Sequence, residues 1–223
     1  RGTTVAKLKH QSSGEIHEIQ KTCRRVDRFG CSCVGCGAGG VLAALRSTYP
    51  ETQLSGYDIA PGAAGFWARH ETARIHFEVG DFLEINHGLQ DVVLLLDVLE
   101  HLGDPFSFLE RLRPHSRYAV FHIPLDLSAI SVLRESPLLH VRERVGHIHY
   151  YTRKLALAML EECGYEIIEA RYTGAALNAP RRSLKTRLAG LAREAVFGIN
   201  HDMGARLMGG ETLLVLAAPK VSA

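Results

Sequence analysis

A glycine-rich stretch near the start of the chain constrains the fold more than any other feature. Residues 33–40 read CVGCGAGG, and the apolar, helix-forming residues 41–45 follow directly. Glycine allows positive φ angles and lets a ligand approach the main chain closely. The stretch therefore predicts a buried strand, a tight ligand-binding turn and the first turns of a helix. Its spacing leaves two patterns open: GxGxG, which ends at Gly39, and the dinucleotide pattern GxGxxG, which ends at Gly40.

Strand-like and helix-like segments alternate after this turn. The run 91–96 is apolar on both faces, as a central parallel strand must be. Prolines at positions where helices commonly begin, Pro61 and Pro105, follow two of the strand-like runs. The alternation predicts an α/β fold, with a parallel sheet between two layers of helices. The other predicted strands are residues 53–58, 75–79, 118–124, 165–170 and 212–218, and the other predicted helices are residues 15–28 and 154–163.

Composition limits the classes of protein to which the chain can belong. Its 223 residues are 46% hydrophobic and 22% charged with a net charge of +2, which is typical of a soluble globular domain and gives no general case for nucleic-acid binding. No apolar run is long enough to span a bilayer, and no secretory leader is recognisable. Five cysteines, an odd number, favour a reducing, cytoplasmic compartment. We interpret Cys31, Cys33 and Cys36 as small core residues, with a metal site as the alternative, and expect no metal.

Polar residues end several of the predicted strands. Asp58 ends the second strand about 20 residues after the glycines, where a carboxylate can accept hydrogen bonds from two ribose hydroxyls. The alternative for Asp58 is an ordinary cap at a strand end. Asp81 and Phe82 follow the third strand, and the pair suits either an adenine site or a helix cap followed by a core phenylalanine. Polar groups at these ends face the ligand crevice of a doubly wound sheet.

The order of these motifs resembles that of the class I S-adenosylmethionine-dependent methyltransferases. The resemblance rests on the glycine turn, Tyr57-Asp58, Gly80-Asp81-Phe82, Asp97-Val98-Leu99-Glu100-His101-Leu102 and Leu112-Arg113-Pro114, and covers about residues 29–173 and the end of the chain. The chain is most similar to methyltransferases of the type 11/12 kind, which include ubiquinone-biosynthesis O-methyltransferases and enzymes acting on sugars and small metabolites. The resemblance implies a Rossmann-like, doubly wound sheet of seven strands in the order 3-2-1-4-5-7-6, mostly parallel with an antiparallel last strand.

The same resemblance implies S-adenosyl-L-methionine as the cofactor and a set of contacts to it. The glycine turn would face the methionine part, Asp58 the ribose, the Asp81–Phe82 pair the adenine, and the Asp97–Val98 pair the sulfonium. One departure counts: Cys33 stands two residues before the first glycine, where the family commonly has an acid. We expect this change to weaken cofactor affinity. The implied cofactor residues are Gly35, Cys36, Gly37, Gly39, Asp58, Ile59, Asp81, Phe82, Asp97 and Val98.

We expect a helical leader at residues 1–28 and a methyltransferase domain at 29–223, with insertions at about 125–150 and about 174–210. Related enzymes place a substrate lid at the first insertion. Histidine is the natural base near neutral pH for a hydroxyl acceptor, with packing or a structural hydrogen bond as the alternative role and a histidine-bound metal as another. His147 and His149 are the preferred pair among the catalytic candidates His101, His122, His147 and His149.

The second insertion is basic and amphipathic over residues 181–197, and two interpretations are open. The segment could contact an anionic membrane or cover a lipidic substrate, or it could be an ordinary packed helix. The leading functional hypothesis is S-adenosylmethionine-dependent methylation of a small or amphipathic metabolite, at oxygen. The alternatives are an NAD(P)-dependent oxidoreductase and a cofactor-binding protein without turnover. The sequence leaves the acceptor, its reacting atom and the oligomeric state open.

Overall fold

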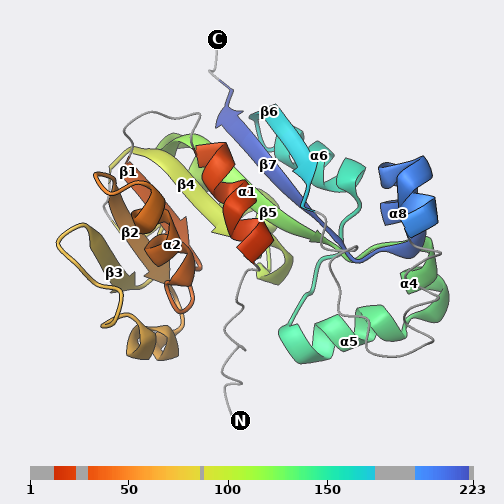
Figure 1. Cartoon of the computed structure of the whole chain (residues 1–223), viewed down its shortest axis with the longest axis horizontal. Helices are drawn as coiled ribbons and strands as arrows, with labels where there is room; N and C mark the ends of the chain where they lie inside the picture. Colours follow the sequence, from red (N-terminus) through yellow and green to blue (C-terminus); the bar gives the residue numbers. More distant parts are fainter. Residues whose placement is uncertain (1–12, 24–29, 86–87, 174–193, 221–223) are drawn as a thin grey trace.

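A seven-stranded sheet forms the centre of the protein (Figure 1). The computed structural model describes residues 13–23, 30–85, 88–173 and 194–220. The strand order is β3-β2-β1-β4-β5-β7-β6, which confirms the order that the family resemblance implied. The strands are β1 (Gly30–Val34), β2 (Gln53–Asp58), β3 (Ile75–Val79), β4 (Gln90–Leu96), β5 (Ser116–Leu125), β6 (Tyr165–Tyr172) and β7 (Glu211–Pro219).

Strand direction divides the sheet into two parts. β3, β2, β1, β4 and β5 pair in parallel, whereas β7 pairs antiparallel with both β5 and β6. β4 lies between β1 and β5, and its residues from Val92 to Leu95 have no exposed surface. That position explains why its sequence is apolar on both faces, because helices cover the two sides of a central parallel strand.

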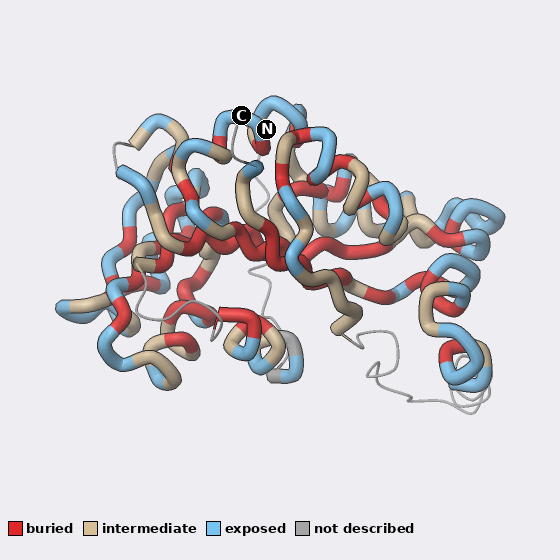
Figure 2. The backbone as a smooth tube through the Cα atoms, turned by 90° about the horizontal axis from the view of Figure 1, so that it is seen from above, coloured by how far each residue is buried: buried red, intermediate tan, exposed pale blue. Residues whose placement is uncertain are grey.

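Two hydrophobic cores lie on the two faces of the sheet. One contains residues of α1 (Ser13–Cys23) and α2 (Gly40–Thr48), and the other contains residues of α3 (Pro105–Leu112) and α6 (Arg153–Glu162). Figure 2 shows the buried residues as a band along the strands, with exposed residues on the outer turns of the helices. The doubly wound arrangement expected from the sequence is therefore present.

Local signals in the sequence set several helix starts. Asp104 accepts a hydrogen bond from the Ser107 amide at 3.0 Å, and Pro105 occupies the first turn of α3. Thr152 caps α6 in the same way. Pro61 opens a 3₁₀ helix, η1 (Pro61–Phe66), rather than an α-helix. Proline at the first helical position is favoured because its missing N–H would have no partner there.

Helix α1 is part of the domain core. Ile19 and Cys23 are buried, and the Gln20 side chain donates hydrogen bonds to the carbonyl of Ala44 and to Thr48 Oγ1. The sequence predicted a helix over residues 15–28; α1 ends at Cys23, and residues 24–28 lie outside the described part of the chain.

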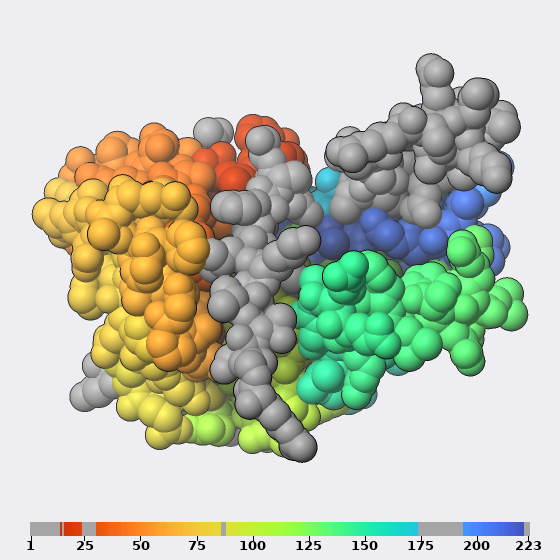
Figure 3. Space-filling model, turned by 90° about the horizontal axis from the view of Figure 1, so that it is seen from below, coloured from red at the N-terminus to blue at the C-terminus, as the bar shows by residue number. Residues whose placement is uncertain are grey.

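The first insertion forms two short helices, α4 (Ala129–Arg134) and α5 (Ser136–Val145), and α4 lies next to α8 (His201–Met208) (Figure 1). Figure 3 shows α4 and α5, in green, at one end of the molecule and residues from about 50 to 85, in orange and yellow, at the other. Most of the basic segment 181–197 lies outside the described residues. None of the described helices has the length and apolarity needed to cross a membrane.

The fold predicts a large effect for a methyl group added at Gly56 in β2. A Cβ there would lie 2.5 Å from the Phe77 ring and 2.9 Å from Cys36 Sγ. We expect Gly56→Ala to lower the free energy of unfolding by about 1–3 kcal/mol through overpacking. Urea denaturation measures this, and Gly62→Ala is the matched control because a Cβ at Gly62 meets no atom within 4 Å. Equal destabilisation of the two variants would contradict the packing described here.

Candidate active site

The residues that the sequence singled out meet at one edge of the sheet. β1, β2 and β4 are parallel neighbours, so the turns that follow their last residues lie side by side. The glycine turn follows Val34, Asp58 ends β2, and Asp97 follows Leu96 at the end of β4. Ligands of doubly wound sheets bind outside this carboxyl edge. The sheet therefore brings these predicted cofactor residues together.

The glycine turn requires glycine for both conformation and space. Gly35, Gly37 and Gly39 have φ angles of 67°, 53° and 81°, a region that side chains disfavour. A Cβ at Gly35 would lie 2.8 Å from Val98 Cγ2, and one at Gly39 would lie 2.6 Å from the Phe77 ring. The turn consequently contacts the loop after β4 on one side and β3 on the other.

Asp58 fixes the shape of the glycine turn. Its Oδ2 accepts a hydrogen bond from the Gly37 amide at 2.8 Å, and its Oδ1 accepts one from the Ala60 amide at 2.8 Å. The carbonyl of Gly37 in turn accepts a 2.8 Å bond from Trp67 Nε1. An ionised carboxylate has about four acceptor sites, so Asp58 can still accept hydrogen bonds from a ligand. The side chain of the next residue, Ile59, is 75% exposed at the same edge.

Of the cysteines around the turn, Cys33 is buried and Cys36 is half-buried, and the pKa of each thiol is raised. Burial raises the pKa of the Cys33 thiol to about 12, and the nearby charge of Asp58 acts in the same direction. Burial also raises the pKa of Cys36, whose backbone amide donates to the Tyr57 carbonyl at 3.0 Å. A neutral core thiol thus occupies the position at which the family commonly has an acid.

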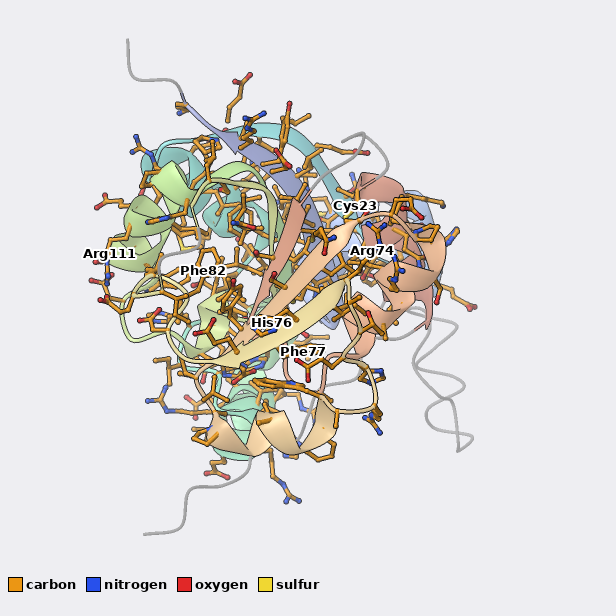
Figure 4. The ribbon with its side chains drawn as sticks, turned by 90° about the vertical axis from the view of Figure 1, so that its left-hand side faces the viewer. Cys23, Arg74, His76, Phe77, Phe82 and Arg111 are labelled. Atoms are coloured by element: carbon orange, nitrogen blue, oxygen red, sulfur yellow. The ribbon has the colours of Figure 1, made fainter. Side chains whose placement is uncertain are left out.

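The surroundings of Asp81 and Phe82 resemble the second interpretation of this pair, a cap followed by a core phenylalanine. Asp81 Oδ1 accepts a hydrogen bond from the Leu83 amide at 2.9 Å, as a cap does. Phe82 is 1% exposed and packs edge-on against Tyr57, with 5.1 Å between ring centroids. Figure 4, which faces the β3 edge, labels Phe82 and Phe77, which belong to the cores on opposite faces of the sheet. An adenine contact of this pair stays a prediction.

Asp97 has an uncommon backbone conformation at the end of β4. Its φ angle is 55°, and few residues other than glycine adopt such angles. Two contacts with β5 hold it: its amide donates to the His122 carbonyl at 3.0 Å, and its Oδ1 lies 2.7 Å from His122 Nδ1. Such strain tends to gather at functional sites. The buried His122 therefore positions Asp97.

The four candidate histidines have different surroundings. His101 and His147 lie together, with 5.0 Å between their ring centroids. His149 Nε2 donates to the Leu102 carbonyl at 2.9 Å, so this bond occupies one ring nitrogen of the histidine predicted to pair with His147. The predicted catalytic roles of all four histidines stay predictions.

Sequence reasoning missed two acids beside these histidines. Glu100, whose side chain has no exposed surface, lies 3.7 Å from both His101 Nε2 and His147 Nε2. Asp126 Oδ2 lies 2.6 Å from His147 Nδ1. The only sequence signal was the place of Glu100 in the string 97–102, which was used there for the family resemblance.

Comparisons with known proteins find methyltransferases among the similar sequences and folds. The family model described as Methyltransferase domain matches residues 33–117. The malonyl-[acyl-carrier protein] O-methyltransferase of Hahella chejuensis (strain KCTC 2396) is 28% identical over 116 residues, which make up 47% of this chain. The chain spans 42% of the length of that relative.

Solved structures share the fold at low sequence identity. The N-methyltransferase NodS of Bradyrhizobium japonicum WM9, in complex with S-adenosyl-L-homocysteine, matches with a TM-score of 0.58 at 14% identity, covering 92% of this chain and 85% of NodS. YcgJ of Bacillus subtilis matches with a TM-score of 0.65 at 13% identity, covering 95% of this chain and all (100%) of YcgJ. The cyclopropane synthase MmaA2 of Mycobacterium tuberculosis matches at 0.63 and 12% identity, covering 97% and 90% of the two chains.

The strand order with antiparallel β7 defines a Rossmann-like methyltransferase fold. The match of the methyltransferase-domain model over residues 33–117, together with this fold, supports a class I S-adenosylmethionine-dependent methyltransferase. The resemblance found in the sequence is confirmed.

The buried Cys33 thiol predicts a specific loss of stability in alkali. Folded Cys33, with a pKa of about 12 instead of 9.0, keeps its proton at pH values at which the unfolded chain loses it. The stability that this group contributes is complete below the unfolded pKa and falls by about 1.4 kcal/mol per pH unit above it. Between about pH 8 and about pH 10, wild type should therefore lose about 1.4 kcal/mol more than Cys33→Ala in urea denaturation. Identical losses would show that Cys33 titrates normally in the folded protein.

Proposed function

We propose that this protein transfers the methyl group of S-adenosyl-L-methionine to an oxygen of a small or amphipathic metabolite. The observation that carries the proposal is the 2.8 Å bond between the Gly37 amide and Asp58 at the carboxyl edge of a methyltransferase sheet. This bond sets a glycine turn and a carboxylate side by side, as a nucleoside cofactor with a ribose diol requires. The NodS complex, which holds S-adenosyl-L-homocysteine on the same fold, supports the choice of cofactor.

In methyl transfer, the main task of the protein is to align the acceptor oxygen with the methyl carbon and the sulfur of the cofactor. A lone pair of the acceptor oxygen forms the new O–C bond, the electron pair of the C–S bond passes to sulfur, and neutral S-adenosyl-L-homocysteine leaves. The proton of the acceptor hydroxyl must pass to a base. Holding the two reactants in line is worth up to about 10⁵–10⁸ M in effective concentration. The turn and Asp58 hold the donor in this scheme.

His147 is the candidate base that the geometry favours most. The Asp126 carboxylate accepts a 2.6 Å hydrogen bond from its Nδ1, which orients the ring and makes Nε2 the atom that would take the proton. The side chain of His147 is 6% exposed, close to the carboxyl end of β4. The curated relative from Hahella chejuensis is named an O-methyltransferase, which agrees with an oxygen acceptor.

Two alternative functions make different predictions. An NAD(P)-dependent oxidoreductase fits the literal GxGxxG spacing, but the antiparallel insertion of β7 between β5 and β6 departs from the parallel dinucleotide-binding sheet. A protein that binds the cofactor without turnover fits the neutral Cys33 thiol. Cytoplasmic location and a membrane contact through residues 181–197 stay predictions, and most of that segment lies outside the described residues.

Cofactor binding tests the proposal directly. We expect S-adenosyl-L-homocysteine, and neither NAD⁺ nor NADP⁺, to raise the melting temperature and to give saturable heat in calorimetry. Asp58→Ala should weaken this binding by about 10- to 100-fold, because a hydrogen bond to a charged group is worth about 1.5–3 kcal/mol. Stabilisation by NAD⁺ alone would overturn the proposal.

A matched variant separates binding from general destabilisation. Asp91 also accepts a hydrogen bond from a backbone amide, that of Gly30, at 2.9 Å, but at the amino edge of the sheet. Asp91→Ala should lower stability while leaving the affinity for S-adenosyl-L-homocysteine within about 2-fold, because the cofactor crevice is at the carboxyl edge. Equal loss of affinity in both variants would place the ligand elsewhere.

His147→Gln tests the catalytic part of the proposal. Removal of a general base typically lowers the rate by about 10²–10⁴-fold, and we expect this loss in methyl transfer from radiolabelled S-adenosyl-L-methionine to a panel of hydroxylated acceptors. Affinity for S-adenosyl-L-homocysteine should not change, because His147 lies outside the cofactor set. Unchanged transfer would exclude His147, and wild-type binding without transfer to any acceptor would favour the protein without turnover.

A further inference from the structure

Three side chains that can bind a metal ion converge beside the carboxyl end of β4. Glu100 and His101 belong to the short helix η2 (Leu99–His101), and His147 lies between α5 and α6. Glu100 Oε1 lies 3.7 Å from Nε2 of each histidine. One ligand atom from each of the three lies within 4.8 Å of the other two. We call Glu100, His101 and His147 the Glu100 cluster.

Hydrogen bonds hold both histidines in the tautomer that a metal ligand needs. The Gly146 carbonyl, which can only accept, lies 3.0 Å from His101 Nδ1, and the Asp126 carboxylate lies 2.6 Å from His147 Nδ1. Each Nδ1 therefore carries a hydrogen, and each Nε2 lies on the side of Glu100. A carbonyl or carboxylate behind the distal nitrogen is the usual support of a metal-binding histidine.

The burial of Glu100 favours a cation at the cluster. The Glu100 side chain has 0% exposure, and a positive charge close to a buried carboxylate offsets part of the cost of its burial. The Glu100 carbonyl accepts hydrogen bonds from the Ile148 and His149 amides at 2.8 and 3.2 Å, which ties the His147 loop to η2. The His101 side chain is 32% exposed, so the cluster includes one residue that solvent reaches.

The spacing suits a first-row divalent cation. A tetrahedral zinc ion with bonds of about 2.0–2.1 Å keeps its ligand atoms about 3.4 Å apart. The two separations of 3.7 Å would thus need to shorten by about 0.3 Å. Two imidazoles and one carboxylate favour zinc-like ions over magnesium or calcium, which prefer oxygen ligands. Three protein ligands also leave a position for a further ligand.

We propose that the Glu100 cluster binds a first-row divalent cation of the zinc type, whose open position takes an oxygen of the methyl acceptor. The proposal of a cation site depends only on the geometry above. The proposal that the ion binds the methyl acceptor rests on the proposed function. With the ion bound, His147 Nε2 is a ligand and does not act as the base. The ion instead acidifies the bound hydroxyl, whose proton passes to solvent water, and the oxygen then attacks the methyl carbon as described above.

Metal binding is tested on the full chain without any cofactor. After treatment with a chelator, calorimetry with Zn²⁺ and the visible spectrum with Co²⁺ should each show one saturable equivalent, and excess Mg²⁺ should not compete. Glu100→Gln and His147→Gln should abolish the saturable equivalent. Asp126→Asn, which keeps all three ligands but weakens the support of His147, should lower the affinity by about 10–100-fold.

His149→Gln is the matched control for these variants. It removes a histidine two residues from His147 whose Nε2 bonds to the Leu102 carbonyl rather than to the cluster, so it should keep one equivalent of Zn²⁺. Circular dichroism checks the fold of each variant, and Asp126→Asn with His147→Gln carries the test if Glu100→Gln does not fold. No saturable Zn²⁺ in wild type, or equal binding in wild type and His147→Gln, would overturn the site.

The two proposals fail in different ways. Binding of S-adenosyl-L-homocysteine is measured on the metal-free protein, and Zn²⁺ binding on the cofactor-free protein. Zn²⁺ binding without S-adenosyl-L-homocysteine binding supports the cation site and overturns the proposed function. S-adenosyl-L-homocysteine binding without Zn²⁺ binding overturns the cation site alone. Methyl transfer that chelation abolishes and Zn²⁺ restores supports the acceptor part, and transfer that chelation does not change overturns it.

Discussion

The hydrogen bond between the Gly37 amide and Asp58 is the contact on which the rest of the site depends. It joins the ends of two parallel neighbours, β1 and β2, at 2.8 Å. A turn with three positive φ angles has little regular hydrogen bonding of its own, so a charged acceptor from the next strand has a large share in its shape. Trp67 and Val98 then close the turn from the sides.

The end of β4 organises the other half of the site. Asp97 holds an unfavourable backbone angle because β5 binds it through both its amide and its side chain. Three residues further on, Glu100 turns into the interior and its carbonyl binds the loop that carries His147. Rigid strand ends thus position both the glycine turn and the Glu100 cluster. A rigid scaffold of this kind can support different functions through changes in its loops.

Much of the fold could be predicted because it depends on local patterns. The strands at residues 53–58 and 75–79 have the predicted bounds, and Asp104-Pro105 marks the start of α3 as expected. Strand order and the antiparallel β7 came from the resemblance to a family, since the pairing of distant strands leaves no local signal. Phe82 shows what local patterns cannot predict. Its burial could not be predicted from the sequence, because an exposed and a buried phenylalanine look alike there.

The sequence by itself determined the class of sheet, the glycine turn and the place of Asp58, because each depends on residues close together or on a period that a strand imposes. Only the tertiary structure decided that Glu100 is buried, that Asp126 supports His147, and that His101 and His147 meet. Those contacts join the ends of β4 and β5 to the loop after α5, and 46 positions separate His101 from His147. The geometry of these contacts arises only when the sheet folds and buries Glu100 away from water. The spacing of these residues along the chain therefore does not predict it.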